Sequence, residues 1–239
     1  MGQPMQYVKI KEAIVEQIES GLLMPKQKLP SERQLAESFS TTRVTLREAL
    51  SLLEAEGKVY REDRRGWFIS PEPLIYDPNQ ALNFSAMALA QHRKPDTKLI
   101  TAKSMLANKF ASKLLKLAPF SHVYSIDRVR YLDERPVAFV TNYVQPTLFP
   151  NLLEHDLNAS LIDVYRDQYQ QEYQCIRYRI TASSLMGTTA QALRATSGSP
   201  ATLVEKMRYN QDGLLLDCAL EFWRHDAMCI ESVVNFASE

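Results

Sequence analysis

Residues 29–57, LPSERQLAESFSTTRVTLREALSLLEAEG, contain the pattern that decides the fold of the first part of this chain. Ser31 precedes Gln34 by three residues, which is the capping-box spacing at the start of a helix. A polar cluster interrupts that helix, and the hydroxyl of Thr42 can accept a first-turn N–H of a second helix. The second helix has one apolar face at helical spacing, made of Leu46, Ala49, Leu50 and Leu53. The stretch therefore predicts two helices joined by a short polar turn, over about 31–54.

The flanking residues extend this unit on both sides. After it, two β-rich runs enclose a charged tip, as expected of a hairpin over about 58–69. Before it, apolar residues recur at helical spacing up to a stop at Gly21; they are Tyr7, Ile10, Ile14 and Ile18. Three helices and a two-stranded ribbon are the plan of a winged helix-turn-helix, in which the later helix enters the major groove. We assign residues 1–72 to this domain.

The charge of the whole chain does not indicate a partner. The 239 residues contain 28 Lys plus Arg and 28 Asp plus Glu, so any contact with nucleic acid must come from local clusters. No apolar stretch reaches the ~18–20 residues of a membrane span, and no signal-peptide pattern is present. The three widely spaced cysteines predict reduced, buried thiols and a cytoplasmic location. The histidines lie far apart, so we expect no metal and no other cofactor.

The predicted second helix of the pair carries side chains that can read DNA. Arg43 and Arg47 lie one turn apart at its start, and an arginine can bond both O6 and N7 of guanine. Thr42 and Thr45 can bond phosphate or touch a thymine methyl group. Arg33, in the first turn of the preceding helix, is within reach of the same duplex. Two such arginines alone would also fit a solvated helix face, but their place in this ordered set of elements favours DNA.

The motifs PSERQLA at 30–36 and TRVTLREAL at 42–50 make this part of the chain similar to a known family. The region resembles the DNA-binding domain of GntR-type bacterial transcription regulators over nearly all of residues 6–69. The resemblance implies that Arg33, Arg43 and Arg47 read DNA. It also implies that the wing tip, around Arg65 and Gly66, lies near the minor groove. Trp67 is a departure, since threonine is frequent at that position of the family.

The remainder of the chain has a different pattern. A cluster of prolines predicts a linker over about 73–80. Two tight connections, at 133–136 and 210–213, join adjacent β-rich runs as hairpins, and short helices lie between such pairs. These signals predict an antiparallel α+β domain over 81–239 rather than a doubly wound sheet. The strands are expected at 98–106, 122–132, 136–145, 174–186, 201–210, 214–224 and 228–236, and the helices at 108–117, 160–170 and 189–195.

An anion site is expected in this second domain. Arg128 and Arg130 alternate along a predicted strand and therefore project from one face, where two guanidinium groups can clamp a phosphate or carboxylate. Ser85, near a predicted helix start, would add further donors to an anion. The two arginines could instead pair with Asp127 or Glu134 on a sheet face.

Short motifs relate the second domain to a ligand-sensing family. DRVRY at 127–131, LFP at 148–150 and FWR at 222–224 make it look like the UTRA domain of the HutC subfamily, similar in fold to chorismate lyase. The resemblance implies that the effector contacts are Ser85, Arg128, Arg130, Ser160, Asp217 and Trp223. Val140 stands where relatives commonly carry a glutamate, so the hydroxyl-recognising groups differ.

These patterns predict a homodimeric, ligand-responsive transcription repressor. It would bind a palindromic double-stranded operator and respond to a small anionic metabolite such as a phosphorylated sugar. The chain has no phosphate-binding loop, no nucleophile elbow and no HExxH motif, so we assign no catalytic residue. Two alternatives remain open at this point. One is a lyase-type enzyme with a vestigial DNA-binding head, and the other is a small-molecule-binding module that does not bind DNA.

Overall fold

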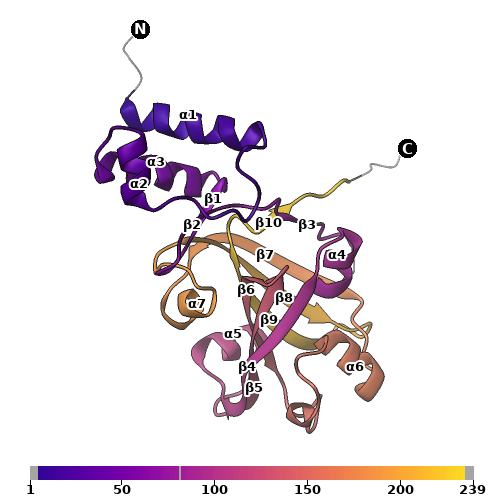
Figure 1. Cartoon of the computed structure of the whole chain (residues 1–239). Helices are drawn as coiled ribbons and strands as arrows, with labels where there is room; N and C mark the ends of the chain where they lie inside the picture. The colour runs from indigo at the N-terminus through magenta and orange to yellow at the C-terminus, as the bar shows by residue number, and fades with distance from the viewer. Residues whose placement is uncertain (1–4, 81, 235–239) are drawn as a thin grey trace.

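The computed structural model describes residues 5–80 and 82–234, and it consists of a helical head above a domain built on one large sheet (Figure 1). Helix α1 precedes the α2–α3 pair, and β1 and β2 form an antiparallel hairpin, the wing. The predicted winged helix-turn-helix is confirmed. The bounds in the head are α1 (Gln6–Glu19), α2 (Glu32–Ser38), α3 (Arg43–Ala55), β1 (Val59–Glu62) and β2 (Gly66–Ile69).

Local capping sets the starts of the two helices in the pair. The Ser31 hydroxyl accepts the Gln34 N–H, and the Gln34 side chain accepts the Ser31 N–H, so the predicted capping box is present. The Thr42 hydroxyl accepts the Thr45 N–H at 3.2 Å. Each cap stabilises its helix by about 1 kcal/mol and fixes the residue at which the helix begins. The first turn of α3 therefore starts at Arg43 because of the residue before it.

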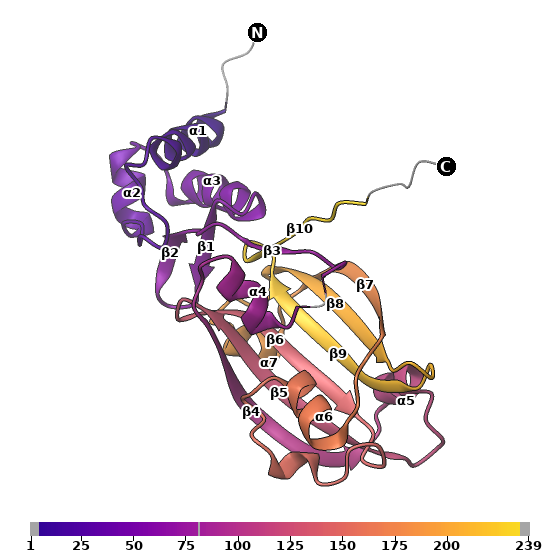
Figure 2. The same cartoon turned by 90° about the vertical axis from the view of Figure 1, so that its right-hand side faces the viewer.

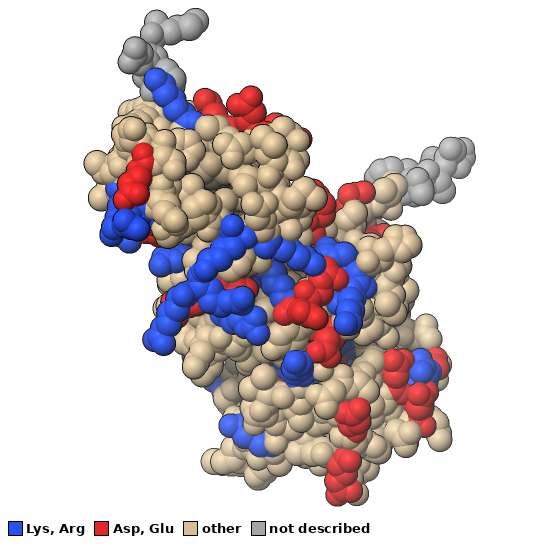
Figure 3. Space-filling model, viewed as in Figure 1, with Lys and Arg blue, Asp and Glu red and all other residues tan. Residues whose placement is uncertain are grey.

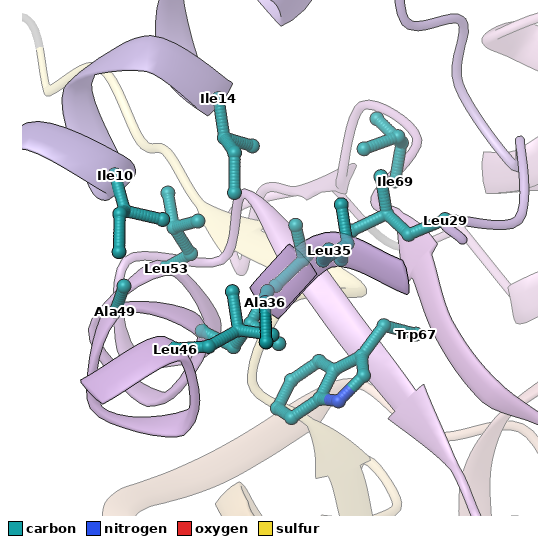
Figure 4. Packing of buried hydrophobic residues seen from close by; sticks show 12 residues of the cluster. Ile10, Ile14, Leu29, Leu35, Ala36, Leu46, Ala49, Leu53, Trp67 and Ile69 are labelled. Atoms are coloured by element: carbon teal, nitrogen blue, oxygen red, sulfur yellow. The ribbon is translucent and has the colours of Figure 1, made fainter. Parts of the chain in front are cut away.

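The head has its own hydrophobic core (Figure 4). Ile10 and Ile14 of α1 pack against the apolar face of α3, where Leu46 and Leu53 are completely buried. Trp67 enters the same core from the wing and is 5% exposed. Burial of each large side chain contributes about 1.5–3 kcal/mol. The wing is therefore packed as part of the head.

The second domain is an antiparallel six-stranded sheet in the order β4-β5-β6-β9-β8-β7, as the hairpin signals predicted. Helices α4 and α6 cover one face, and α5 and α7 cover the other (Figure 2). The strands are β4 (Pro95–Leu106), β5 (His122–Leu132), β6 (Arg135–Val144), β7 (Cys175–Ser184), β8 (Pro200–Tyr209) and β9 (Leu215–Arg224). The helices are α4 (Phe84–Ala90), α5 (Lys109–Leu115), η1 (Leu152–Glu154), α6 (Leu161–Tyr169) and α7 (Gly187–Ala192).

The segment predicted as a linker contains a short strand. β3 (Leu74–Tyr76) pairs in parallel with β10 (Met228–Ile230), the last strand that the structure describes. The prolines at 71 and 73 precede the paired residues and so leave the ladder intact. Leu74 and Tyr76 are buried in the core of the second domain, and this burial orders the segment. The predicted strand at 228–236 ends at Ile230, and its residues 235 and 236 lie outside the described part of the chain.

The cysteines agree only in part with expectation. Cys218 is buried on β9, but Cys175 and Cys229 are exposed because each lies on a strand at the edge of its sheet. The prediction of three buried thiols was therefore wrong for two of them. In residues 5–80 and 82–234, no helix combines the length and the apolar character needed to cross a bilayer.

A buried cluster of charges joins the head to the end of the sheet. Asp226, after β9, pairs with Arg135 at the start of β6 at 2.5 Å and accepts the Ser70 hydroxyl of the head at 3.1 Å. Arg224 donates to the Arg61 carbonyl of the wing at 3.1 Å. Burial alone would raise the pKa of Asp226, but Arg135 and Arg224 lower it. The contact between the two parts is therefore built on ionic and polar groups that water does not reach.

Candidate nucleic-acid interface and ligand cavity

A basic groove of about 750 Å³ lies between the start of α2, the start of α3 and the wing. Figure 3 shows blue side chains gathered on this side of the head and across its junction with the sheet domain. One carboxylate, Glu32, lines the groove. A concave surface with this charge balance fits a polyanion. The basic residues that line it, which define the basic groove below, are Lys28, Arg33, Arg43, Arg61, Arg64 and Arg65.

Of the predicted reading residues on the helix pair, Arg33 and Arg43 line this groove, whereas Thr42, Thr45 and Arg47 lie outside its lining. Arg43 is exposed at the first position of α3, and Arg33 is exposed in the first turn of α2, where it pairs with Glu37 at 3.4 Å. The Thr42 hydroxyl caps α3 and lies 3.0 Å from the hydroxyl of Thr45. Thr42 therefore positions the helix, while the two arginines keep their guanidinium groups at the surface.

Arg47 is held by a chain of contacts that runs to the wing. Its Nε donates to a Glu32 oxygen at 2.7 Å, and the other Glu32 oxygen accepts the Trp67 indole N–H at 3.1 Å. Burial alone would raise the pKa of Glu32, but the hydrogen bonds from Arg47 and Trp67 lower it, so this side chain stays a carboxylate at neutral pH. Trp67, the departure from the family pattern, is thus a core residue whose polar edge, through Glu32, positions an arginine on the second turn of α3.

The wing tip is built on a glycine in a left-handed backbone conformation. Gly66 has φ +101°, which an L side chain rarely adopts, and an added Cβ would lie 3.6 Å from the Lys28 side chain. Arg65 pairs with the buried Glu62, and its guanidinium lies 5.6 Å from the Phe68 ring centroid. Arg64 has a side chain that is 93% exposed. The most accessible cation of the tip is therefore Arg64, one residue before the predicted one.

A second site lies between the large sheet and the covering helices α4 and α6. This ligand cavity encloses about 60 Å³. Arg128 and Arg130 of β5 both line it, as their alternation predicted, together with Lys206 and Arg208 of β8. Four cationic side chains therefore face one small space in the interior of the domain.

Arg128 is held by uncharged groups. Its guanidinium donates to the Ala159 carbonyl at 3.1 Å and to Asn142 Oδ1 at 3.0 Å, and it makes no ion pair within residues 5–80 and 82–234. Val140 lies directly opposite on β6, so this neighbour supplies no carboxylate. Burial lowers the pKa of Arg128 to about 10, and the side chain remains a cation at neutral pH. A buried, protonated arginine without a carboxylate partner favours an anionic ligand.

The other three cations share two buried carboxylates. Glu221 lies 3.1 Å from Arg130 and 2.9 Å from Lys206, while Asp217 bonds Arg208 at 2.8 Å. Burial alone would raise the pKa of Glu221, but the two cations lower it. Burial lowers the pKa of Lys206 to about 8, against the opposing effect of Glu221. Asp217 lines the cavity and Glu221 lies outside its lining, so the four cations of the cavity outnumber these two carboxylate partners by two.

The remaining predicted effector contacts differ in accessibility. Ser85 in the first turn of α4 and Ser160, the N-cap of α6, both line the ligand cavity. Asp217 is completely buried, and it also accepts hydrogen bonds from Asn142 and the Tyr165 hydroxyl.

Trp223 is completely buried and lies outside the cavity lining. Its indole N–H donates to Glu221 at 3.0 Å, so the predicted effector contact is a core residue that supports a cavity-side carboxylate.

Five cationic residues of the two sites were absent from the predicted contacts; they are Lys28, Arg61, Arg64, Lys206 and Arg208. Lys206 and Arg208 alternate along a strand in the same way as Arg128 and Arg130, and this spacing alone would have placed them on one face. Arg64 belongs to the charged wing tip, but its exposure relative to Arg65 depends on how the hairpin turns. Glu221 gives no such local signal, because its partners lie on other strands.

Known proteins share both parts of this arrangement. Residues 6–69 match the family described as bacterial regulatory proteins, gntR family, and residues 90–228 match the UTRA domain. The chain is 31% identical to the HTH-type transcriptional regulator YihL of Escherichia coli K12, over 94% of this chain and 95% of that protein. It is 28% identical to the HTH-type transcriptional repressor NagR of Bacillus subtilis, over 92% and 90% of the two chains. The crystal structure of PhnF from Mycobacterium smegmatis has the same fold, with a TM-score of 0.66, 21% identity, and coverage of 95% and 99%.

A winged helix with a basic groove, joined to a sheet domain with a charged cavity, defines a ligand-responsive transcription regulator. The chain belongs to the GntR family of bacterial regulatory proteins, and its second part is a UTRA domain, the HutC-type combination. Its relatives are named as regulators, so the protein is a regulator rather than the lyase-type enzyme considered above.

Proposed function

We propose that the protein is a repressor that binds a palindromic operator as a homodimer and is released by a small dianionic metabolite, such as a sugar phosphate. One winged helix reads only a few base pairs, whereas two related by a twofold axis read a palindrome with linked affinity. The name of the relative NagR, a transcriptional repressor, supports the direction of regulation. Because its operator is chromosomal DNA, we place the protein in the cytoplasm.

The observation that supports DNA reading is the basic groove, which Arg43 lines, with Arg47 one turn further along α3. We expect Arg43→Ala and Arg47→Ala each to cost about 1–3 kcal/mol and to relax preference at one base position. Arg177→Ala, an exposed arginine on β7, is the control with the same charge change.

The measurement is the affinity for the duplex that the wild-type protein selects from a random-sequence pool, compared with unrelated duplex, over a range of salt concentrations. Unchanged base preference in both Arg43→Ala and Arg47→Ala would contradict the assignment. A single protomer bound to the selected duplex would contradict the homodimer.

The charge of the ligand cavity supports the effector class. Four cations face two carboxylates, so a ligand with two negative charges would neutralise the interior. The cavity of about 60 Å³ is small beside typical ligand sites of ~300–1,000 Å³. A sugar-sized effector therefore requires movement of the segments that cover the cavity, the starts of α4 and α6. Such a movement would link effector binding to the rest of the molecule.

The effector proposal is tested by titration calorimetry with sugar phosphates and with the corresponding uncharged sugars. We expect binding of the phosphorylated compounds alone and loss of that binding in Arg128→Met. Arg177→Met is the control. Operator DNA and effector must weaken each other by the same factor, since coupling is reciprocal. An effector that saturates the protein without changing operator affinity would contradict release by that compound.

A further inference from the structure

The wing tip is hydrogen-bonded to the segment that follows α7 of the UTRA domain. The Asp63 N–H donates to the Arg194 carbonyl at 2.9 Å. Arg194 has φ +52°, in the left-handed region, and its N–H donates to the Gln191 carbonyl, so the chain turns sharply where α7 ends. The Arg194 side chain is exposed. An arginine of the second domain is thereby held beside the wing of the first.

A second groove, of about 470 Å³, connects the wing tip to this turn. Arg64 and Arg194 both line it, and Asp63, 3.7 Å from Arg64, is its one acidic residue. Neutral hydrogen-bonding side chains complete its lining; they are Gln191, Thr196 and Ser197. The side chains in this groove are therefore of the kinds that contact a phosphodiester backbone.

The two grooves form one surface. Arg64 lines both of them, so the basic groove continues past the wing tip onto the UTRA domain. Residues 196–200 also line a groove with Arg47 and Arg61, and this groove shares Arg61 and Trp67 with the basic groove. The blue side chains across the junction of head and sheet domain in Figure 3 lie in this region. A duplex seated in the basic groove has further phosphates at regular intervals beyond the bases it presents.

We propose that the UTRA domain takes part in DNA binding, with Arg194 contacting a backbone phosphate just outside the bases that α3 reads. The proposal rests on DNA binding by the basic groove. Arg194 adds affinity and register but no base preference, because phosphate contacts carry no sequence information. The partner is the flanking double helix itself. Two alternatives give different results in the same test. In one, the turn after α7 is only solvated and does not contact DNA; in the other, it obstructs the duplex.

The test is a salt titration of DNA binding by Arg194→Gln, with Arg177→Gln as the matched control. The probes are the duplex selected by the wild-type protein, carrying ten flanking base pairs at each end, and the same duplex trimmed to the selected bases. We expect Arg194→Gln to lower the log–log salt slope by ~0.9 per bound protomer on the long duplex. Its affinity for selected and unrelated long duplexes should fall by the same factor, and the defect should vanish on the trimmed duplex. Arg194→Lys should keep the wild-type slope.

Wild-type affinity and slope in Arg194→Gln on the long duplex would overturn the proposal, and tighter binding would show that the loop obstructs DNA. Both outcomes are separable from failure of the proposed function, in which the wild-type protein would fail to select any sequence. Thermal unfolding of each variant shows whether the turn after α7 is intact. If Arg194→Gln unfolds early, Arg194→Lys decides: a slope lowered in that variant also contradicts the phosphate contact.

Discussion

The guanidinium of Arg135 lies over the ring of Tyr60, with its central carbon 3.5 Å from the ring centroid. Tyr60 belongs to the wing, and Arg135 begins the strand that pairs with β9. Strand β9 contains Asp217, which lines the ligand cavity, and Glu221, which pairs with the cavity cations Arg130 and Lys206. Asp226, just after the strand, pairs with Arg135. One strand therefore connects the cavity to the cluster on which the wing rests. A shift of β9 on effector binding would reach the wing directly.

This connection predicts that Tyr60→Leu weakens the communication between effector and operator. Removal of the ring abolishes a desolvated cation–π contact worth about 2 kcal/mol. We expect the effector to change operator affinity by less than twofold in this variant, against the 5–150-fold typical of allosteric coupling. The measurement is operator affinity with and without saturating effector. Tyr60→Phe keeps the ring and should keep the response, and a full response in Tyr60→Leu would rule out this route.

The exposure of Val44 leads us to predict that its side chain contacts a thymine methyl group. It is the second residue of α3 and 76% exposed, whereas the apolar face of the same helix is completely buried. An apolar side chain beside Arg43 cannot bond phosphate but can cover the C5 methyl of thymine.

Replacement of that thymine by deoxyuridine should weaken operator binding by about fourfold, corresponding to ~0.8 kcal/mol for one buried methyl group. The measurement is a scan of single deoxyuridine substitutions across the selected duplex. In Val44→Ala the same substitution should have little further effect. A uniform response of wild type and Val44→Ala at every position would contradict the contact.

The lowered pKa of Lys206 leads us to predict that effector binding weakens as pH rises. Its pKa is lowered to about 8, so above that pH the group loses the proton and the charge that favour an anion. A phosphate monoester has its second pKa near ~6 and stays dianionic throughout this range. We expect affinity to fall between about pH 7.5 and 9.5, approaching tenfold per pH unit at the upper end.

Calorimetry across this range measures the effect, and Lys206→Arg, which stays charged, should give a flat profile in the same window. Because the folded pKa lies below the ordinary value of ~10.4, the unfolded chain binds more protons between these values. The contribution of Lys206 to the unfolding free energy therefore rises with pH in that window, opposite to the change in affinity. A steep fall that persists in Lys206→Arg would assign the titration to another group.

The burial of Asp217 leads us to predict that its replacement strongly lowers the free energy of unfolding. It is completely buried and faces Arg208, which is also buried, across the β8–β9 ladder. Asp217→Asn leaves a buried cation without its carboxylate, and we expect a loss of about 3–5 kcal/mol in the unfolding free energy. Urea unfolding measures it, with Asp212→Asn in the exposed turn as a control expected within ~0.5 kcal/mol of wild type. Equal stability of the two variants would show that Asp217 is not the main counter-ion of Arg208.

Much of the head could be predicted because its signals are local. The capping box at Ser31, the cap at Thr42 and the apolar face of α3 each depend on residues within a few positions of one another. The alternation of Arg128 and Arg130 is likewise a property of one strand, and it placed both in one cavity. The β3 strand was not predictable, since its partner β10 lies more than 150 residues further along the chain.

The sequence by itself determined the winged helix, the antiparallel class of the second domain and the presence of arginines on α3, because periodicity and capping act over short distances. Tertiary structure alone decided that Trp67 supports Arg47 through Glu32, that Trp223 lies beneath the ligand cavity, and that Arg194 lies beside the wing. These relationships join residues from different strands and domains. Their energies depend on burial and on the distance between charges, and neither quantity exists until the chain has folded.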